Sequence, residues 1–273
     1  MKIIEFHGGL GNQLFEYVYY LYLRRLFPNE KFFSYSPSRA TKVHYGLEIQ
    51  KWFDVQLPPT SIKTNFLGWI SYWGIRVLRR LSVTPYWISD DNHLNHRKLY
   101  HEGWYQNVIY QKNITLPHFK NNLKLDSANI NVMKQLSSCN SISVHVRRGD
   151  YLEQKNYKSV GGICTIDYYQ KAIALIQSKI SSPFYFFFSD DPQYVKDQFQ
   201  DVNPKVVVDI NKGEQSFYDM YLMAHAKNMI LANSTFSCWA AYLNPTKGMI
   251  ICPSKWNNMM DLNLTKPDWK TIV

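Results

Sequence analysis

The second half of the chain, from about Asp126 onward, alternates short apolar runs with helix-like spacings. Each run ends at polar residues, as expected of strands that are buried in a sheet. The predicted strands lie at 141–146, 184–188, 205–210, 229–232 and 249–252. Between the first two, Tyr169, Ile173 and Ile176 recur at helical intervals. Strands that alternate with helices in this way predict an α/β fold with a parallel, doubly wound sheet.

The first half starts in the same manner and then loses its regularity. A predicted strand at 2–7 leads through the glycine-rich segment GGLGNQ, at 8–13, into a helix that ends near Phe27. From 30 to about 124 the apolar spacing rarely persists for ten residues, which predicts loops and short helices, with 102–106 as a strand that enters a loop. We therefore expect two domains, 1–124 and 125–253, with the tail 254–273 packing back on the first.

One segment within the irregular region has an unusual composition. Residues 66–81, FLGWISYWGIRVLRRL, interleave aromatic and aliphatic residues with Arg76, Arg79 and Arg80. Such a segment suits an interfacial helix that rests on anionic lipid. The favoured interpretation is an ordinary surface helix whose apolar side packs on the core.

Length and cysteine usage restrict the class of protein. A chain of 273 residues can bury a sizeable core without disulfides or a structural metal. Its four cysteines are scattered without a CxxC pair, which argues against a zinc cluster and fits thiols in a reducing compartment. The first residues form too short an apolar run for a signal peptide, and no run is long enough for a transmembrane helix. We expect a cytoplasmic protein, soluble or peripheral on the inner face of the cell membrane.

The formal net charge of +10 is concentrated in the first half. Residues 1–120 carry 15 Lys and Arg against 8 Asp and Glu, whereas residues 121–273 carry 16 against 13. A basic surface suits nucleic acid, an anionic membrane or an anionic substrate. Because the chain has no helix-turn-helix, zinc-finger or RNP-type motif, nucleic acid is not an expected partner.

Two arginines follow the predicted strand 141–146 in the segment SISVHVRRGDY. The planar guanidiniums of Arg147 and Arg148 suit bidentate binding of phosphate oxygens, and Gly149 permits a sharp turn. The alternative is a structural salt-bridge cluster in which Asp150 neutralises an arginine. We expect Arg147 to contact a diphosphate, and Arg148 mainly to hold Asp150 and the turn.

Polar residues also follow other predicted strands. Ser189-Asp190-Asp191 and Asn233-Ser234-Thr235-Phe236-Ser237 lie at strand ends, so they should share one rim of the sheet with Arg147. Ser234 or Thr235 can simply cap the following helix, or that helix terminus can bind a phosphate. Asp190 can accept hydrogen bonds from a guanine edge or a ribose hydroxyl, or be a solvated carboxylate.

The glycine-rich segment at 8–13 has the same ambiguity. A strand, a glycine loop and a helix can present backbone N–H groups to an anion, and Asn12 and Gln13 add polar side chains. The segment is neither a Walker A loop nor a GxGxxG motif, so it can also be a simple tight turn.

Taken together and in order, these segments resemble a known family. GGLGNQLFEYVYY, HVRRGDY and ANSTFSCWAAYLN, with the shorter GWYQN and CPSKW, are similar to the signature segments of the α-1,2-fucosyltransferases. The resemblance implies two facing Rossmann-like domains in the GT-B arrangement, with parallel sheets and helices on both faces. It implies an inverting, metal-independent transfer of L-fucose from GDP-β-L-fucose to the 2-hydroxyl of a galactoside. The first domain would then bind the acceptor and the second the GDP-sugar.

The resemblance also assigns roles to particular residues. It places Arg147 on the donor diphosphate as the main catalytic residue and His145 in the donor pocket. The other donor-binding residues that we expect are Gly9, Gly11, Asn12, Gln13, Arg148, Asp190, Ser234, Thr235 and Phe236. Two departures stand out: Cys238-Trp239 replaces a usual pair of tryptophans, and residues 41–99 match nothing in the family, which leaves the acceptor open.

The chemistry needs charge stabilisation more than it needs a metal. Departure of GDP leaves an oxocarbenium-like sugar and extra negative charge, which Arg147 and the helix terminus at Ser234 would stabilise. Because no DxD motif with further ligands is present, we expect no metal and no cofactor beyond the donor substrate. Candidate general bases are His7, Glu5 and Asp150, and a mechanism dominated by leaving-group departure needs no strong base.

Other functions remain open at this point. A transferase of the same fold that uses another sugar nucleotide or linkage, and a non-catalytic nucleotide- or glycan-binding protein, both fit these motifs. The family leads us to expect a galactose-terminated, lipid-linked acceptor in surface-polysaccharide or O-antigen assembly. The oligomeric state is not predicted.

Overall fold

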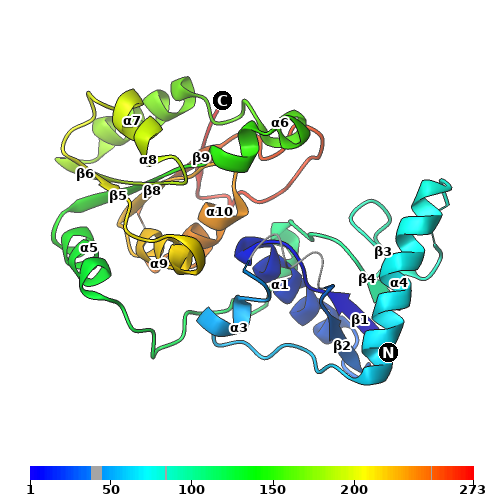
Figure 1. The fold of residues 1–273 in the computed structure, drawn as a ribbon. Coiled ribbons are helices and arrows are strands. Elements are labelled where there is room, and N and C mark those ends of the chain that lie inside the picture. The colour runs from blue at the N-terminus through cyan, green and yellow to red at the C-terminus, as the bar shows by residue number, and fades with distance from the viewer. Residues whose placement is uncertain (38–44, 84, 247) are drawn as a thin grey trace. The chain divides into compact units, whose positions relative to one another are not determined.

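The computed structural model describes residues 1–37, 45–83, 85–246 and 248–273. It divides the chain into two compact units, Met1–Asn121 and Asn122–Val273, whereas the expected boundary follows residue 124. Each unit contains a parallel sheet flanked by helices (Figure 1). The prediction of an α/β protein built on two parallel sheets is therefore confirmed.

The first unit has a four-stranded sheet in the order β2-β1-β4-β3. The elements are β1 (Lys2–Glu5), α1 (Leu10–Leu26), β2 (Phe32–Tyr35), α3 (Ile49–Trp52), α4 (Ile62–Arg80), β3 (Ile88–Ser89), β4 (Tyr100–His101) and the 3₁₀ turn η1 (Val108–Gln111). The predicted first strand and the helix after the glycine segment are present. The chain leaves β1 toward β2 and later returns to the other side of β1 at β4. The point where the strand order reverses therefore lies between β1 and β4.

Helix α4 contains most of the segment 66–81, for which both interpretations expected a helix, and it is longer than the short helices expected in this region. It starts at a capping box, in which the Ser61 hydroxyl accepts from the Thr64 N–H at 3.1 Å and the Thr64 hydroxyl accepts from the Ser61 N–H at 2.9 Å. Its buried side is made of small residues as well as aromatic ones, so no strong apolar stripe marks the core side. None of the helices in the described part of the chain is both long and apolar enough to cross a membrane.

The second unit has a six-stranded parallel sheet in the order β10-β9-β8-β5-β6-β7. Its strands are β5 (Asn140–Val146), β6 (Pro183–Ser189), β7 (Lys205–Val208), β8 (Asn228–Ile230), β9 (Ile250–Pro253) and β10 (Lys270–Ile272). Its helices are α5 (Ser127–Ser138), α6 (Gln154–Val160), α7 (Ile166–Lys179), α8 (Pro192–Gln198), α9 (Phe217–Ala224) and α10 (Thr235–Tyr242), with 3₁₀ turns η2 (Gly149–Leu152) and η3 (Gly213–Ser216).

Two parts of this unit differ from the sequence analysis. No helix was predicted where α6 lies, because its polar composition gives no apolar spacing to read. The tail 254–273 was expected to pack on the first domain, but its strand β10 extends the sheet of the second unit beside β9.

The core of the second unit follows from alternation along its strands. Ile142, Val144 and Val146 of β5 point toward α7, where they pack with Ile173 and Ile176. The opposite face of β5 meets α9, because the Ser143 hydroxyl lies against the carbonyl of Met223 at 3.5 Å. Both faces of the sheet are thus covered, and the strand ends remain as the place where polar residues can gather (Figure 1).

Candidate functional site

Three polar segments of the second unit lie at one rim of its sheet. Strands β8, β5 and β6 are neighbours and run parallel, so their carboxyl ends meet at the same edge. Hydrogen bonds join the segments: Tyr151 OH donates to the Asn233 carbonyl at 3.0 Å, and the Arg148 N–H donates to Asp190 Oδ1 at 2.9 Å. The predicted sharing of one rim is confirmed.

This rim contains the point at which the strand order reverses. The chain runs from β5 outward through β6 and β7 and then returns to the other side of β5 at β8. In open α/β sheets, ligands bind in the crevice between the strands at such a point. Arg147 follows β5, and Ser234 follows β8, so these two residues flank the reversal.

Arg147 is a partly exposed cation that two carboxylates hold in place. Its Nε and Nη2 donate to Asp150 Oδ1 at 3.0 and 2.6 Å, and its Nη1 lies 3.1 Å from Asp190 Oδ2. One third of its side chain is exposed. Burial disfavours the charge, but Asp190 and Asp150 outweigh it and raise the pKa of Arg147. A guanidinium with a fixed orientation suits an oxyanion ligand.

The partner of Arg148 differs from the prediction. Arg148 was expected to hold Asp150, but it is Arg147 that pairs with this carboxylate. The Arg148 Nε instead lies 3.1 Å from Asp191 Oδ2, and its guanidinium stacks 3.5 Å above the Tyr194 ring. Both arginines therefore belong to ion pairs, and Arg148 is additionally fixed by an aromatic ring.

Asp190 contacts both arginines and leaves no room for a side chain at position 149. One of its oxygens accepts from the Arg148 N–H and the other pairs with Arg147. A Cβ added to Gly149 would lie 2.5 Å from Asp190 Oδ2. Glycine is thus required for close approach of the carboxylate to the turn, rather than for an unusual backbone angle.

His145 is a buried, uncharged histidine at the end of β5. Its carbonyl accepts from Tyr169 OH at 2.9 Å, and its ring centroid lies 5.9 Å from that of Phe236. Burial, assisted by the charge of Arg147, lowers its pKa to about 3. Among the described residues, its buried Nδ1 has no hydrogen-bond partner.

The start of α10 completes the rim. The Ser234 hydroxyl accepts from the Phe236 N–H at 3.3 Å, so Ser234 does cap this helix as one of the two interpretations predicted. Thr235 is the first residue of the helix, and Thr235 and Phe236 are both half-buried. The N-terminus of α10 places a partial positive charge beside Arg147's strand.

In the first unit, the glycine-rich segment meets the GWYQN segment. Gln106 Nε2 donates to Asn12 Oδ1 at 3.0 Å, and the His7 ring stacks on Trp104 with centroids 4.1 Å apart. Gly9 is the N-cap of α1 and Gly11 lies in its first turn. Gly8 has a positive φ of 71°, and a Cβ there would clash with Trp104 at 2.7 Å.

The side-chain amide of Gln13 makes four hydrogen bonds to backbone groups of its own unit. Its side-chain nitrogen donates to the carbonyls of Gly8 and Gly46, both at 2.9 Å. Its oxygen accepts from the N–H groups of Glu48 and Ile49 at 2.8 and 3.1 Å. The side chain is completely buried. These contacts give Gln13 a structural role, whereas Asn12 is half-buried at the surface of the segment.

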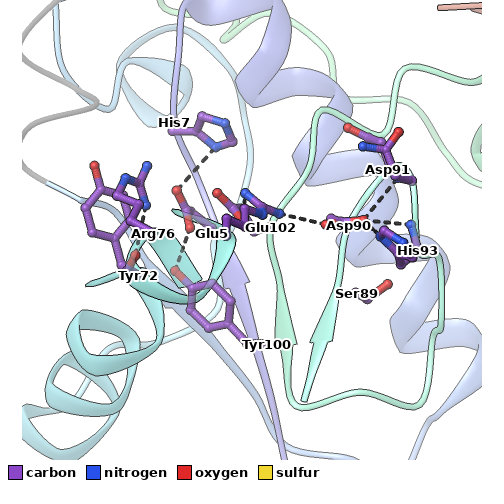
Figure 2. Close-up of polar contacts among 12 residues, drawn as sticks. Glu5, His7, Tyr72, Arg76, Ser89, Asp90, Asp91, His93, Tyr100 and Glu102 are labelled. Carbon is purple, nitrogen blue, oxygen red and sulfur yellow. Dashed lines mark hydrogen bonds and ion pairs between the residues drawn. The ribbon is translucent and has the colours of Figure 1, made fainter. Parts of the chain in front are cut away.

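A cluster of acidic residues surrounds His7 at the reversal point of the first sheet. His7 Nδ1 lies 2.9 Å from Glu16 Oε1 and 3.8 Å from Glu5 Oε1. Glu5 in turn accepts from Tyr100 OH at 2.5 Å (Figure 2). Sequence reasoning named Glu5 and His7 but missed Tyr100, which lies 95 residues from Glu5, and Glu16, which lies on the following helix. The sequence feature that could have indicated Glu16 is its acidic side chain on the otherwise apolar side of α1.

Burial and charge shift these groups together. Burial opposes the charge of His7, but Glu16 and then Glu5 outweigh it and raise its pKa to about 9. Burial also raises the pKa of Glu5 and of Glu16 to about 7, with His7 opposing both shifts. The cluster thus contains an imidazolium and carboxyl groups that can change protonation near neutral pH.

The acidic character continues toward β3. Arg79 of α4 bridges Glu102 at 3.0 Å and Asp90 at 2.6 Å. Asp91 accepts from the N–H groups of Trp104 and Tyr105 at 2.7 and 3.0 Å, which fixes the GWYQN segment. In the described part of the chain, no three His, Cys, Asp or Glu side chains are grouped so as to hold a metal ion.

Comparison with known proteins identifies relatives of this chain. A family model described as glycosyl transferase family 11 matches residues 87–272. The O-antigen biosynthesis glycosyltransferase WbnK of Escherichia coli is 36% identical over 131 residues, 46% of this chain and 43% of that protein. An alpha-1,2-colitosyltransferase of Escherichia coli is 34% identical over 148 residues, 54% of this chain and 50% of that protein. The chain spans about half the length of these two relatives.

More distant proteins match as well. The galactoside alpha-(1,2)-fucosyltransferase 2 of Rattus norvegicus is 30% identical over 103 residues, 37% of this chain and 29% of the rat protein. Among solved structures, the fucosyltransferase NodZ from Bradyrhizobium matches with a TM-score of 0.53 at 13% identity, covering 89% of this chain and 92% of NodZ. This likeness shows a shared fold.

Proposed function

This chain belongs to glycosyl transferase family 11, and we propose that it moves L-fucose from GDP-β-L-fucose to the 2-hydroxyl of a galactoside with inversion. The relatives support both the reaction and the linkage, since two of them are named for α-1,2 transfer and one for a galactoside acceptor. The observation that carries the proposal is that Arg147 and the start of α10 follow the two neighbouring strands that flank the reversal point of the second sheet.

In this proposal the second unit binds the donor. Arg147 and the N–H groups at the start of α10 would hold the diphosphate and stabilise the charge that develops as GDP leaves. Asp150 acts as a positioning residue, because it orients the Arg147 guanidinium through two hydrogen bonds. His145 and Phe236 would contact the nucleotide, and Asp190 and Arg148 would complete the pocket.

The first unit would then handle the acceptor and its proton. A raised pKa makes His7 an imidazolium at neutral pH, so His7 itself is a poor base. We assign His7 to binding an oxygen of the substrate. The buried carboxyl groups of Glu5 and Glu16, whose pKa values lie near 7, would take up the proton that the acceptor hydroxyl loses. Gly9, Gly11 and Asn12 would contribute backbone and amide groups from the same rim. Asp150 is less suited as a base, because it is paired with Arg147.

A second donor has specific support. One of the bacterial relatives is named as a colitosyltransferase. Colitose is the 3-deoxy analogue of fucose, so the same diphosphate clamp and the same inversion serve both sugars. Discrimination between them rests on contacts to the 3-hydroxyl. The O-antigen relative favours an oligosaccharide acceptor in surface-polysaccharide assembly, carried on a lipid in our proposal.

Incubation of the purified protein with GDP-fucose, GDP-colitose and a UDP-sugar, each with a panel of β-galactosides, tests the proposal. We expect a fucosylated or colitosylated product whose linkage, determined by NMR, is α-1,2, and we expect EDTA to leave the rate unchanged. Turnover with the UDP-sugar alone, or a rate restored only by manganese, would contradict it. Binding of GDP without any turnover would indicate a nucleotide-binding protein instead.

A further inference from the structure

Helix α4 carries apolar residues on two opposite sides. The side that packs on the sheet is formed by Thr64, Gly68, Ser71, Tyr72 and Ile75. A Cβ added to Gly68 would lie 2.4 Å from Tyr35 Cγ, so the small residue allows the helix to approach β2 closely. A second set of apolar residues faces away from the sheet. They are Ile62, Phe66, Trp69, Ile70, Trp73 and Val77, which we call the outer stripe.

The outer stripe is strongly exposed. Phe66 is 59% exposed, Trp69 is 52% and Trp73 is 40%. The exposed apolar residues continue past the helix with Leu81 and with Tyr86, which is 81% exposed. Of the two interpretations of this segment, a surface helix with an apolar side on the core is confirmed for Tyr72 and Ile75, but it does not account for the outer stripe. Contiguous exposed apolar surface of this kind marks an interaction site.

The charged residues of helix α4 are all positive. Helix α4 contains no Asp or Glu, and its cations are Lys63, Arg76, Arg79 and Arg80. Arg79 is used internally by Asp90 and Glu102. Lys63 and Arg80 are exposed at opposite ends of the helix. A second copy of the chain would bring the same cations to the contact, so charge complementarity favours an anionic partner.

We propose that α4 lies in the headgroup region of an anionic membrane, with the outer stripe inserted and its cations against lipid phosphates. Tryptophan and tyrosine are the apolar residues that prefer this region, because one part of the ring is polar. Lys63 and Arg80 would add electrostatic attraction to acidic lipid. Binding of this kind is independent of the sugar donor and holds the protein where a lipid-linked substrate would be found.

Flotation of the full chain with vesicles tests the proposal without any enzyme assay. We expect binding to phosphatidylcholine vesicles that contain phosphatidylglycerol, weaker binding to phosphatidylcholine alone, and release by salt. The double substitution Trp69→Ser and Trp73→Ser should lower the partition coefficient by about tenfold or more. The matched control, Leu94→Ser with Ile109→Ser, removes two exposed apolar side chains elsewhere in the unit and should leave it unchanged.

A charge variant separates the two contributions. Lys63→Glu with Arg80→Glu should weaken binding to the anionic vesicles by about tenfold or more and leave the weak binding to phosphatidylcholine as it is. Circular dichroism should show the same unfolding midpoint for all variants, since the altered side chains are exposed. Absence of anionic-vesicle binding by the native chain, or equal binding by the tryptophan variant, would overturn the proposal. A native dimer that the tryptophan variant converts to a monomer, without vesicle binding, would assign the stripe to a second copy.

Discussion

The two units place opposite chemistry at the same point of similar sheets. Between β5 and β8, the second unit has a partly exposed arginine and the start of a helix. Between β1 and β4, the first unit has buried carboxyl groups around a histidine. The reversal of strand order thus fixes where a site forms, whereas the residues after each strand decide what it binds.

Overall charge does not reveal this difference. Residues 1–120 carry the larger excess of Lys and Arg, yet the reversal point of this half is acidic. Much of the excess lies on α4 and the surface, where Lys63 and Arg80 are exposed. Net charge therefore indicates which partners the surface attracts. The chemistry of a site depends instead on the few charged groups that meet there.

Replacement of Arg147 should give the largest effect. Arg147→Ala should lower kcat for transfer from GDP-fucose by about 10²- to 10³-fold, because the charge on departing GDP would lose its main partner. Arg148→Ala is the matched control, since it also removes a guanidinium paired with an aspartate, and should cost less than about tenfold. Steady-state kinetics measure both, and equal losses would place the phosphate on neither arginine in particular.

Gln13 and Asn12 separate structure from binding in the first unit. Gln13→Ala should lower the free energy of unfolding by about 2–4 kcal/mol, because it removes four hydrogen bonds to backbone groups, three of them buried. Asn12→Ala should cost less than about 1 kcal/mol while reducing turnover. Urea denaturation followed by circular dichroism measures the stability. An unchanged midpoint for Gln13→Ala would refute the structural role of this side chain.

The free energy of unfolding should depend on pH through the ion pair that His7 makes with Glu16. Its folded pKa of about 9 lies above the ordinary value of 6.5, so its contribution is complete below pH 6.5 and is lost as the pH rises through 9. Between pH 7 and 9 the free energy of unfolding should fall by about 2 kcal/mol. His7→Gln should alter this slope, because it removes the imidazolium and raises the pKa of Glu5 and Glu16 further, and the exposed His118→Gln should keep it. A slope in His7→Gln identical to that of the native chain would mean that His7 is not an imidazolium in the folded protein.

The sequence predicted the second unit better than the first for a physical reason. Strands β5 and β6 are seven residues long and buried, so their apolar pattern is unambiguous. Strands β3 and β4 have two residues each, which is too short for any period to be read. The core side of helix α4 was obscured because it mixes small residues with Tyr72 and Ile75, while other bulky residues of the helix face outward.

The candidate site shows the same limit. The shared rim of the second sheet could be predicted, because parallel strands carry their ends to one edge. The pairing of Asp150 with Arg147 rather than Arg148 could not, since it depends on the turn after β5. Tyr100 was missed because folding brings it to Glu5 from a distant position in the chain, and Glu16 because its contact with His7 depends on how α1 follows β1.

The assignment of the diphosphate to the second unit is tested most directly by calorimetric titration of GDP into the native chain, Arg147→Ala and His7→Gln. The native chain should bind GDP, Arg147→Ala should bind it about 10- to 100-fold more weakly through loss of charge-assisted hydrogen bonds, and His7→Gln should bind it as the native chain does. Undiminished GDP affinity in Arg147→Ala, or its loss in His7→Gln, would contradict the division of chemistry between the two units.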